Sequence, residues 1–273
     1  MKQLARLIRR ICPNKMYIDW ENYNKIGFPV DYYGVTLKNG TILKNRIYYL
    51  IEGSAITSIS PVFDLLVKKH ILRCFSVGIE NGKDYYKFDY RVKIPALHDL
   101  IVLLRSELPY IDERSICELC SYFTKSNKQF YLRVLGITAN LRQKQVDDIC
   151  LYFYTHEKIC YDRDQKFFNE IGMRAFNKSL PDNIVWPVCN EYGYLCFAAL
   201  DFNRNGSKKI KFYFEFLCGY EQDLFMPLFE NTNMYDHVCE IVKSDARIDM
   251  YQVAIDERGE VSYNFYLKEK KYG

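Results

Sequence analysis

The sequence predicts an α+β fold: a ten-stranded antiparallel β-barrel built from five helix–strand–strand repeats and surrounded by α-helices. Three observations predict it. Five segments have the pattern of β-hairpins, in which β-branched and aromatic runs flank short polar turns. Segments with the apolar spacing of amphipathic helices lie between these hairpins. Finally, the second strands of the hairpins alternate polar or tyrosine residues with strongly apolar ones, which indicates a sheet with two different faces.

The hairpins are marked by their turns. The first runs from Val30 to Leu50 and turns at Lys38-Asn39-Gly40, and an Asn-Gly pair is a strong signal for a two-residue hairpin loop. The second is expected at residues 74–94 with a turn at 80–83, and the third at residues 130–154 with a less regular middle. The fourth is expected at residues 194–217 with a turn at 203–206, and the fifth at residues 250–268 with a turn at 256–259.

Helices are expected between the hairpins. Residues 95–108 place Leu97, Leu100, Ile101 and Leu104 on one helical face. Residues 4–11, 115–123, 167–176 and 236–242 behave similarly. Because no Gly/Ser-rich or Pro-rich linker divides the chain, we expect a single domain over residues 1–273.

The alternation in the second strands decides which face points inward. The polar faces carry Lys87, Asp89 and Arg91; Cys150, Tyr152 and Tyr154; Lys211, Tyr213 and Glu215; and Asn264 and Tyr266. Helices would cover the opposite faces, for example Phe212, Phe214 and Phe216, so the polar faces would line the inside of a closed sheet. An α+β sandwich whose polar faces meet water is the alternative. The Lys-x-(Asp/Tyr)-x pattern in two hairpins favours the barrel.

Composition narrows the function. The 273 residues carry a net charge of +4. This charge is compatible with binding a small anion, but it is too weak and too evenly spread along the chain to indicate nucleic-acid binding. The N-terminus has no signal-peptide core, and no window is apolar enough to span a membrane, so we expect a cytoplasmic protein with reduced cysteines. Cys117 and Cys120 form a CxxC pair without the second ligand pair that a zinc site needs, and we expect them on a buried helix face.

Two hairpins resemble a known family. The segment Ser76-Val-Gly-Ile-Glu80, followed by Lys87-x-Asp89-x-Arg91, resembles the cyanobactin peptide prenyltransferases, where it reads Ser-Val-Gly-Ile-Asp and then Lys-x-His-x-Arg. Asp31 and Arg46 lie fifteen residues apart, as do an acid and an arginine of that family. This family belongs to the ABBA (PT-barrel) prenyltransferases, whose barrel holds an allylic diphosphate and an aromatic or peptide acceptor.

The resemblance implies a role for each candidate residue. Asp31 would be the catalytic carboxylate that accepts a proton from the acceptor. Aromatic faces attract an allylic cation, and Phe197 would limit the prenyl chain to five carbons. The diphosphate-binding residues would be Arg46, Lys87, Arg91 and Lys211, and the cation shield would be Tyr152, Tyr213 and Tyr266.

The family uses Mg²⁺ with its diphosphate. Asp89 stands at a histidine position of the family and Glu215 stands near another, so these two acids would help to place the metal through the diphosphate. Asp147-Asp148 is not part of a DDxxD motif, so the sequence does not support a Mg²⁺ site of the kind found in the trans-isoprenyl synthases.

The sequence therefore predicts a peptide prenyltransferase that transfers a dimethylallyl group from dimethylallyl diphosphate, through an allylic carbocation, to a side chain or terminus of a ribosomal peptide. We expect a monomer with no nucleic-acid or membrane partner. Two alternatives stay open. The acceptor could be a small aromatic metabolite, or the chain could be a non-catalytic β-rich protein that binds a peptide or RNA.

Overall fold

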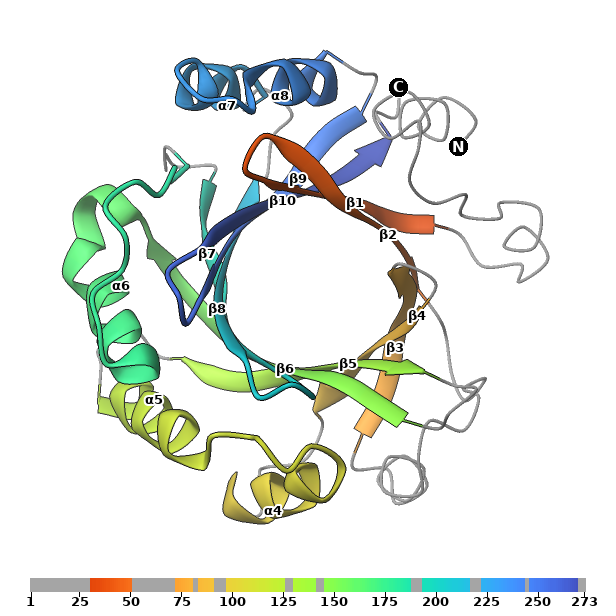
Figure 1. Ribbon diagram of the computed structural model, residues 1–273, viewed down its shortest axis with the longest axis vertical. Helices are drawn as coiled ribbons and strands as arrows, with labels where there is room; N and C mark the ends of the chain where they lie inside the picture. Colours follow the sequence, from red (N-terminus) through yellow and green to blue (C-terminus); the bar gives the residue numbers. More distant parts are fainter. Residues whose placement is uncertain are drawn as a thin grey trace.

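The computed structural model describes residues 30–50, 72–80, 83–90, 97–125, 130–140, 145–187, 193–216, 222–243 and 246–269. The strands in these ranges are all antiparallel to their neighbours, and they form a closed barrel in the order β1-β10-β9-β8-β7-β6-β5-β4-β3-β2 (Figure 1). Their bounds are β1 (Val30–Lys38), β2 (Thr41–Leu50), β3 (Leu72–Glu80), β4 (Lys83–Tyr90), β5 (Tyr131–Asn140), β6 (Gln145–Ile159), β7 (Gly193–Asn203), β8 (Lys208–Phe216), β9 (Ala246–Asp256) and β10 (Val261–Glu269).

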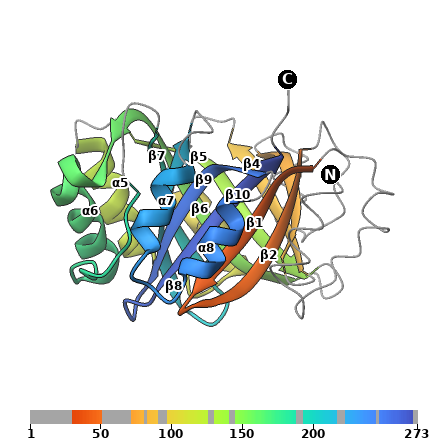
Figure 2. The same ribbon diagram turned by 90° about the horizontal axis from the view of Figure 1, so that it is seen from above.

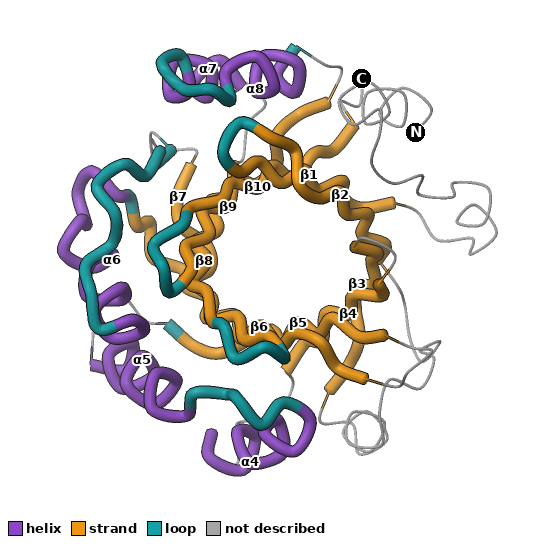
Figure 3. Tube along the Cα trace, in the orientation of Figure 1, coloured by secondary structure: helices purple, strands orange, loops and turns teal. Residues whose placement is uncertain are grey.

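The described helices lie outside the barrel wall (Figure 3). They are α4 (Leu97–Glu107), α5 (Glu113–Lys125), α6 (Tyr161–Phe176), α7 (Gln222–Phe229) and α8 (Tyr235–Val242). In the side view, α7 and α8 lie over the β9–β10 hairpin, while α5 and α6 lie at the left end of the molecule (Figure 2). Within the described residues, no helix combines the length and apolar character needed to cross a membrane.

The predicted order of elements is confirmed across the described chain, with one omission. Helix α7 was not expected, because it is short and contains Pro227, which lacks the N–H of a regular helical residue. The helix predicted at residues 4–11 lies outside the described residues.

The first hairpin turn has the conformation that its sequence predicts. Asn39 and Gly40 both adopt positive φ angles, 48° and 70°, between the paired residues Lys38 and Thr41. Two positive φ angles in succession define the turn that matches the twist of a hairpin, and Asn-Gly is the pair that adopts them most readily. Gly40 is also required by space, because an added Cβ would lie 2.9 Å from the side chain of Asn233.

The largest apolar core lies between the barrel and its helices. On β8, Phe212 and Phe214 are fully buried and point outward, where Phe212 contacts Phe168 of α6 and Trp186 at ring-centroid distances of 5.0 and 5.5 Å. Lys211 and Tyr213 alternate with them and point inward. The two faces therefore separate as the alternation predicts: phenylalanine toward the helices, lysine and tyrosine toward the interior.

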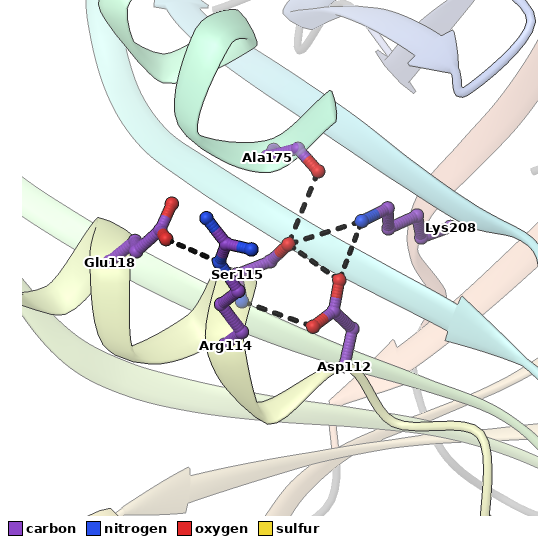
Figure 4. Close-up of polar contacts among 6 residues, drawn as sticks. All are labelled: Asp112, Arg114, Ser115, Glu118, Ala175 and Lys208. Carbon is purple, nitrogen blue, oxygen red and sulfur yellow. Dashed lines mark hydrogen bonds and ion pairs between the residues drawn. The ribbon is translucent and has the colours of Figure 1, made fainter. Parts of the chain in front are cut away.

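A polar cluster holds the start of α5 against α6 and β8 (Figure 4). Asp112 precedes the helix and accepts hydrogen bonds from the Ser115 backbone N–H (3.2 Å) and hydroxyl (2.7 Å), which is the geometry of an N-cap. Lys208 of β8 lies 2.6 Å from the same carboxylate, and the Ser115 hydroxyl also lies 3.2 Å from the Ala175 carbonyl of α6. The Ser115 side chain of α5 thus contacts both α6, through Ala175, and β8, through Lys208.

The cysteine pair of α5 corrects one expectation. Cys120 is half-buried, and burial raises the pKa of its thiol to about 12, but Cys117 is exposed. Only one of the two therefore lies toward the core. Neither cysteine forms a disulfide bond, and among the described residues no group of three or more His, Cys, Asp or Glu could hold a metal ion.

Candidate functional site

The strand register places the predicted residues in rows across the inner face of the barrel. One row runs through Asn264, Gln252, Tyr213, Phe197, Tyr154 and Tyr131, on β10, β9, β8, β7, β6 and β5. The next row holds Ala254, Lys211, Ala199, Tyr152, Val134 and Asp89. A further row holds Lys209, Asp201, Cys150, Gly136 and Lys87. Residues that are far apart in sequence therefore share one surface.

The three predicted shield tyrosines come together. Tyr152, Tyr213 and Tyr266 are 4%, 1% and 2% exposed, and they pack in an interior cluster that is separate from the outer core. The hydroxyl of Tyr213 lies 3.3 Å from that of Tyr152, and its ring centroid lies 6.1 Å from that of Tyr266. Ring faces gathered in this way, away from water, can attract a cation. The three residues were expected at equivalent places on their strands, but the register puts Tyr213 in the first row and Tyr152 in the second, while Tyr266 is in register with Met250 and Gly34.

Phe197 joins the tyrosines at one side. Its ring centroid lies 6.0 Å from Tyr152, 5.2 Å from Tyr154 and 6.3 Å from Tyr213, and the side chain is half-buried. Phe197 therefore lies against the tyrosine cluster and not in the outer core, so its volume bears directly on the space beside Tyr152 and Tyr213.

Lys211 lies in the interior as expected, but its charge is already balanced. Its Nζ lies 2.6 Å from a carboxylate oxygen of Asp201 on β7, and both side chains are nearly buried, 8% and 15% exposed. A charge withdrawn from water is stable only when it is paired, so Asp201 holds Lys211 in the barrel in place of an anion. Asp201 was not predicted from the sequence, although an acid within the apolar run of β7 is a usable signal.

The remaining basic and catalytic candidates are placed by their backbone alone. Arg46 on β2 is in register with Gly34, and Gly34 with Tyr266. Lys87 on β4 is in register with Gly136. Asp31 falls at an irregularity of β1, between the paired residues Val30 and Tyr32. Arg91 lies outside the described residues. Arg46 and Lys87 are thus at positions that continue the interior rows.

The two acids expected near Mg²⁺ are not neighbours in the sheet. Asp89 is on β4 and Glu215 on β8, with three strands between them. Burial raises the pKa of Glu215, and the charge of Asp249 raises it further, while Lys268 lowers it. Asp249 is itself held by Arg247 (3.0 Å) and by Lys268 (3.2 Å). Glu215 therefore belongs to a charge-balanced group at the end of β8.

A hydrogen-bonded network crosses the interior next to the tyrosines. The Thr36 hydroxyl donates to Asn264 Oδ1, and Asn264 Nδ2 donates to Gln252 Oε1. The Tyr266 hydroxyl donates to the same Gln252 oxygen at 3.0 Å. Asn264 and Tyr266 were expected on this face, whereas Gln252 and Thr36 were not predicted from the sequence. A glutamine within the apolar strand β9 was the available signal.

Aromatic side chains continue from the interior to the surface. Tyr154 contacts Phe197 on one side, and its hydroxyl lies 3.3 Å from His156 Nδ1 on the other. The Tyr131 hydroxyl lies 3.1 Å from His156 Nε2, and Tyr131 is 41% exposed. Tyr131, Tyr154 and His156 form an aromatic rim, which links the buried tyrosines with solvent.

Comparison with solved structures identifies the fold. The 6-dimethylallyltryptophan synthase of Micromonospora olivasterospora, in complex with DMASPP and Trp, aligns over 97% of this chain and 95% of its own, with 12% identity and a TM-score of 0.54. The 5-dimethylallyltryptophan synthase of Streptomyces coelicolor aligns over 96% and 95%, with 9% identity and a TM-score of 0.53. NotF, in complex with brevianamide F and DMSPP, aligns over 91% and 82%, with 12% identity and a TM-score of 0.57.

The chain has the ABBA prenyltransferase fold. The resemblance noted in the sequence is confirmed at this level, while the solved structures give no support to the cyanobactin branch in particular. No protein-family model and no curated protein sequence matches the chain. At 9–12% identity the likeness carries the fold, so the chemistry must be argued from the residues of this barrel.

Proposed function

We propose that this protein is a prenyltransferase that moves a dimethylallyl group from dimethylallyl diphosphate to an aromatic acceptor. The observation that carries the proposal is the buried cluster of Tyr152, Tyr213 and Tyr266 on the inner face of a barrel with this fold. Ionisation breaks the bond between C1 of the prenyl group and oxygen, and the electron pair stays on the diphosphate. The tyrosine faces stabilise the allylic cation, by roughly 0.5–2 kcal/mol per ring, and the buried interior excludes water that would capture it.

The basic residues would bind the leaving diphosphate. Arg46, Lys87, Arg91 and Lys211 are the candidates, because an anion with several charges needs several donors. Mg²⁺ entering with the diphosphate would neutralise part of its charge, and Asp89 and Glu215 are the candidates to orient it. After the acceptor carbon or heteroatom attacks the cation, Asp31 would take the proton that the acceptor loses.

A small aromatic acceptor is the reading we favour. Solved structures with this fold hold tryptophan or brevianamide F, which supports a compact aromatic acceptor. A ribosomal peptide is the second candidate. It is favoured by the segment 76–91 and by the exposed aromatic rim of Tyr131, Tyr154 and His156, against which a longer acceptor could lie.

The test is direct. Purified protein with dimethylallyl diphosphate and Mg²⁺ is offered free aromatic amino acids, Trp- and Tyr-containing diketopiperazines and linear and cyclic peptides, and mass spectrometry detects the addition of one dimethylallyl group. Prenylation of the small acceptors alone supports the favoured reading, and prenylation of peptides alone supports the second. The absence of a dimethylallyl adduct, together with no binding of the diphosphate, contradicts both.

Two variants connect the activity to the basic residues. Arg46→Ala and Lys87→Ala are expected to abolish turnover while the protein stays folded, because losing one donor from a closed site costs about 2–5 kcal/mol. Arg114→Ala is the matched control, since it removes one positive charge from the exposed face of α5. Near-normal activity in both Arg46 and Lys87 variants contradicts the diphosphate assignment.

A further inference from the structure

Among the described residues, the side-chain amide of Gln252 inside the barrel has donors without a partner. Gln252 is fully buried on β9, in register with Asn264 on one side and Tyr213 on the other. Its Oε1 accepts from Asn264 Nδ2 and from the Tyr266 hydroxyl, which uses both lone pairs. Within the part of the chain that the structure describes, Gln252 Nε2 has no hydrogen-bond partner.

Such a donor needs a physical reason, because the large majority of buried polar side-chain atoms are hydrogen-bonded. The neighbouring network makes the arrangement specific. Thr36 holds Asn264, and Asn264 together with Tyr266 holds the Gln252 oxygen, so the amide group has a fixed position beside the tyrosine cluster. Gln252 is thus a preorganised donor on the inner face of the barrel, ready for an oxygen that the described residues do not supply.

The charges around Gln252 indicate which kind of oxygen. Its partners and register neighbours, Asn264, Tyr213 and Tyr266, are all uncharged, as is Thr36, which bonds Asn264. Lys211 lies on the adjacent interior row, but Asp201 is paired with it at 2.6 Å. A diphosphate is matched best by Arg and Lys, whereas a neutral amide suits an uncharged carbonyl oxygen.

We propose that the Gln252 amide binds a carbonyl oxygen of the acceptor. The acceptor is then an aromatic compound that also carries an amide-type carbonyl, such as an amino-acid amide, a diketopiperazine or a peptide, and not a bare aromatic ring. The inference rests on the proposed function and narrows its acceptor class. Because the amide is fully buried, the side chains around it shift to admit the carbonyl.

The experiment measures binding and needs no turnover. The protein is saturated with an unreactive dimethylallyl thiolodiphosphate, and calorimetry then gives Kd for two probe pairs: N-acetyltryptophanamide against 3-ethylindole, and N-acetyltyrosinamide against 4-ethylphenol. In the wild type, the carbonyl-bearing probe of at least one pair binds more tightly. Gln252→Met removes the donor at similar volume and is expected to weaken that probe about three- to tenfold, leaving the carbonyl-free probe unchanged.

Two further variants keep the result interpretable. Thr36→Val removes a hydrogen bond of the same network that does not involve Gln252, and the bonds from Asn264 and Tyr266 to Gln252 Oε1 stay, so the preference for the carbonyl is retained. Gln252→Leu lacks the Nε2 donor as well, so it also loses the preference; it decides the matter if thermal unfolding shows that the Met variant is not folded.

Three outcomes overturn the inference. Equal wild-type affinity for both members of each pair removes its basis. If the Gln252 variants lose affinity only for the thiolodiphosphate, the amide binds the diphosphate and not the acceptor. Binding of the thiolodiphosphate without any of the four probes contradicts the acceptor class alone, whereas failure to bind the thiolodiphosphate itself contradicts the proposed function.

Discussion

At the residue scale, the pair Lys211–Asp201 shows how the barrel keeps a cation in its interior before any anion binds. Both side chains are largely withdrawn from water, so each needs the other. A diphosphate that binds Lys211 must compete with Asp201, and it also meets the negative charge of that carboxylate. Asp201 is therefore expected to stabilise the fold and to lower the affinity of Lys211 for the proposed diphosphate.

Asp201→Asn separates these two effects. We expect the free energy of unfolding to fall by about 1.5–3 kcal/mol, because Lys211 loses a charged hydrogen-bond partner. The KM for dimethylallyl diphosphate is expected to fall in the same variant, because Lys211 becomes available and the repulsion disappears. Urea denaturation and initial rates measure both, with Glu157→Gln on the exposed part of β6 as the control. A higher KM would mean instead that Asp201 positions Lys211 for the diphosphate.

Phe197 offers a test of donor length. Phe197→Ala or Phe197→Gly removes a ring that contacts Tyr152, Tyr154 and Tyr213, so space opens beside the tyrosine cluster. We expect the wild type to prefer the five-carbon donor and the variants to shift toward geranyl diphosphate. Competition between the two donors measures the ratio. Since Phe→Ala in a core costs roughly 3–5 kcal/mol, unfolding is followed in parallel; a wild-type preference for the ten-carbon donor would show that Phe197 does not limit the chain.

At the scale of elements, the sequence predicted the features that depend only on neighbouring residues, such as turns and the faces of single strands. The Asn39-Gly40 turn could be predicted because the pair itself favours positive φ angles. The inward face of β8 could be predicted because Lys211 and Tyr213 alternate with Phe212 and Phe214. Gln252 and Asp201 could not be assigned in the same way, because their partners lie on other strands and depend on register, which no single strand encodes.

Asp112 makes the start of α5 sensitive to acid. Burial raises the pKa of Asp112, but hydrogen bonds from Lys208 and Ser115 outweigh burial and lower the pKa from 3.8 to about 2. A depressed pKa means that the ionised carboxylate stabilises the fold above pH about 4, and that this contribution is lost as the pH falls toward 2. Asp112→Asn keeps a capping oxygen but has no carboxylate to protonate, so its free energy of unfolding should not include this decrease at low pH.

The measurement is urea unfolding at a series of pH values between about 5 and 2. Asp112→Ala, which also removes the cap, is expected to cost about 1 kcal/mol at neutral pH. The difference between wild type and Asp112→Asn should shrink as the pH falls through this range. A difference that stays constant would mean that the carboxylate charge contributes nothing to the link between α5, α6 and β8.

At the scale of the whole molecule, closure of the sheet ties the first described strand to the last. Strand β1 pairs with β10, and the Thr36–Asn264 and Lys38–Glu260 contacts cross this junction. A closed barrel leaves no strand with a free edge, so no strand can leave without exposing the backbone of two others. Helix α6 is coupled to the barrel as well, because its Phe168 packs on Phe212 of β8.

The barrel and its helices are therefore expected to unfold in one cooperative step. Trp186 reports on the outer layer, since it stacks on Tyr161 with a centroid distance of 4.3 Å, and Trp20→Phe leaves it as the single tryptophan. Its fluorescence and the circular dichroism of the sheet should lose their native signals at the same urea concentration. A bound thiolodiphosphate should raise both midpoints together, because at a hundredfold excess over Kd it adds about 2.7 kcal/mol to the free energy of unfolding. An earlier loss of the Trp186 signal would show that the helical layer unfolds by itself, and that residues 1–273 are not one cooperative unit.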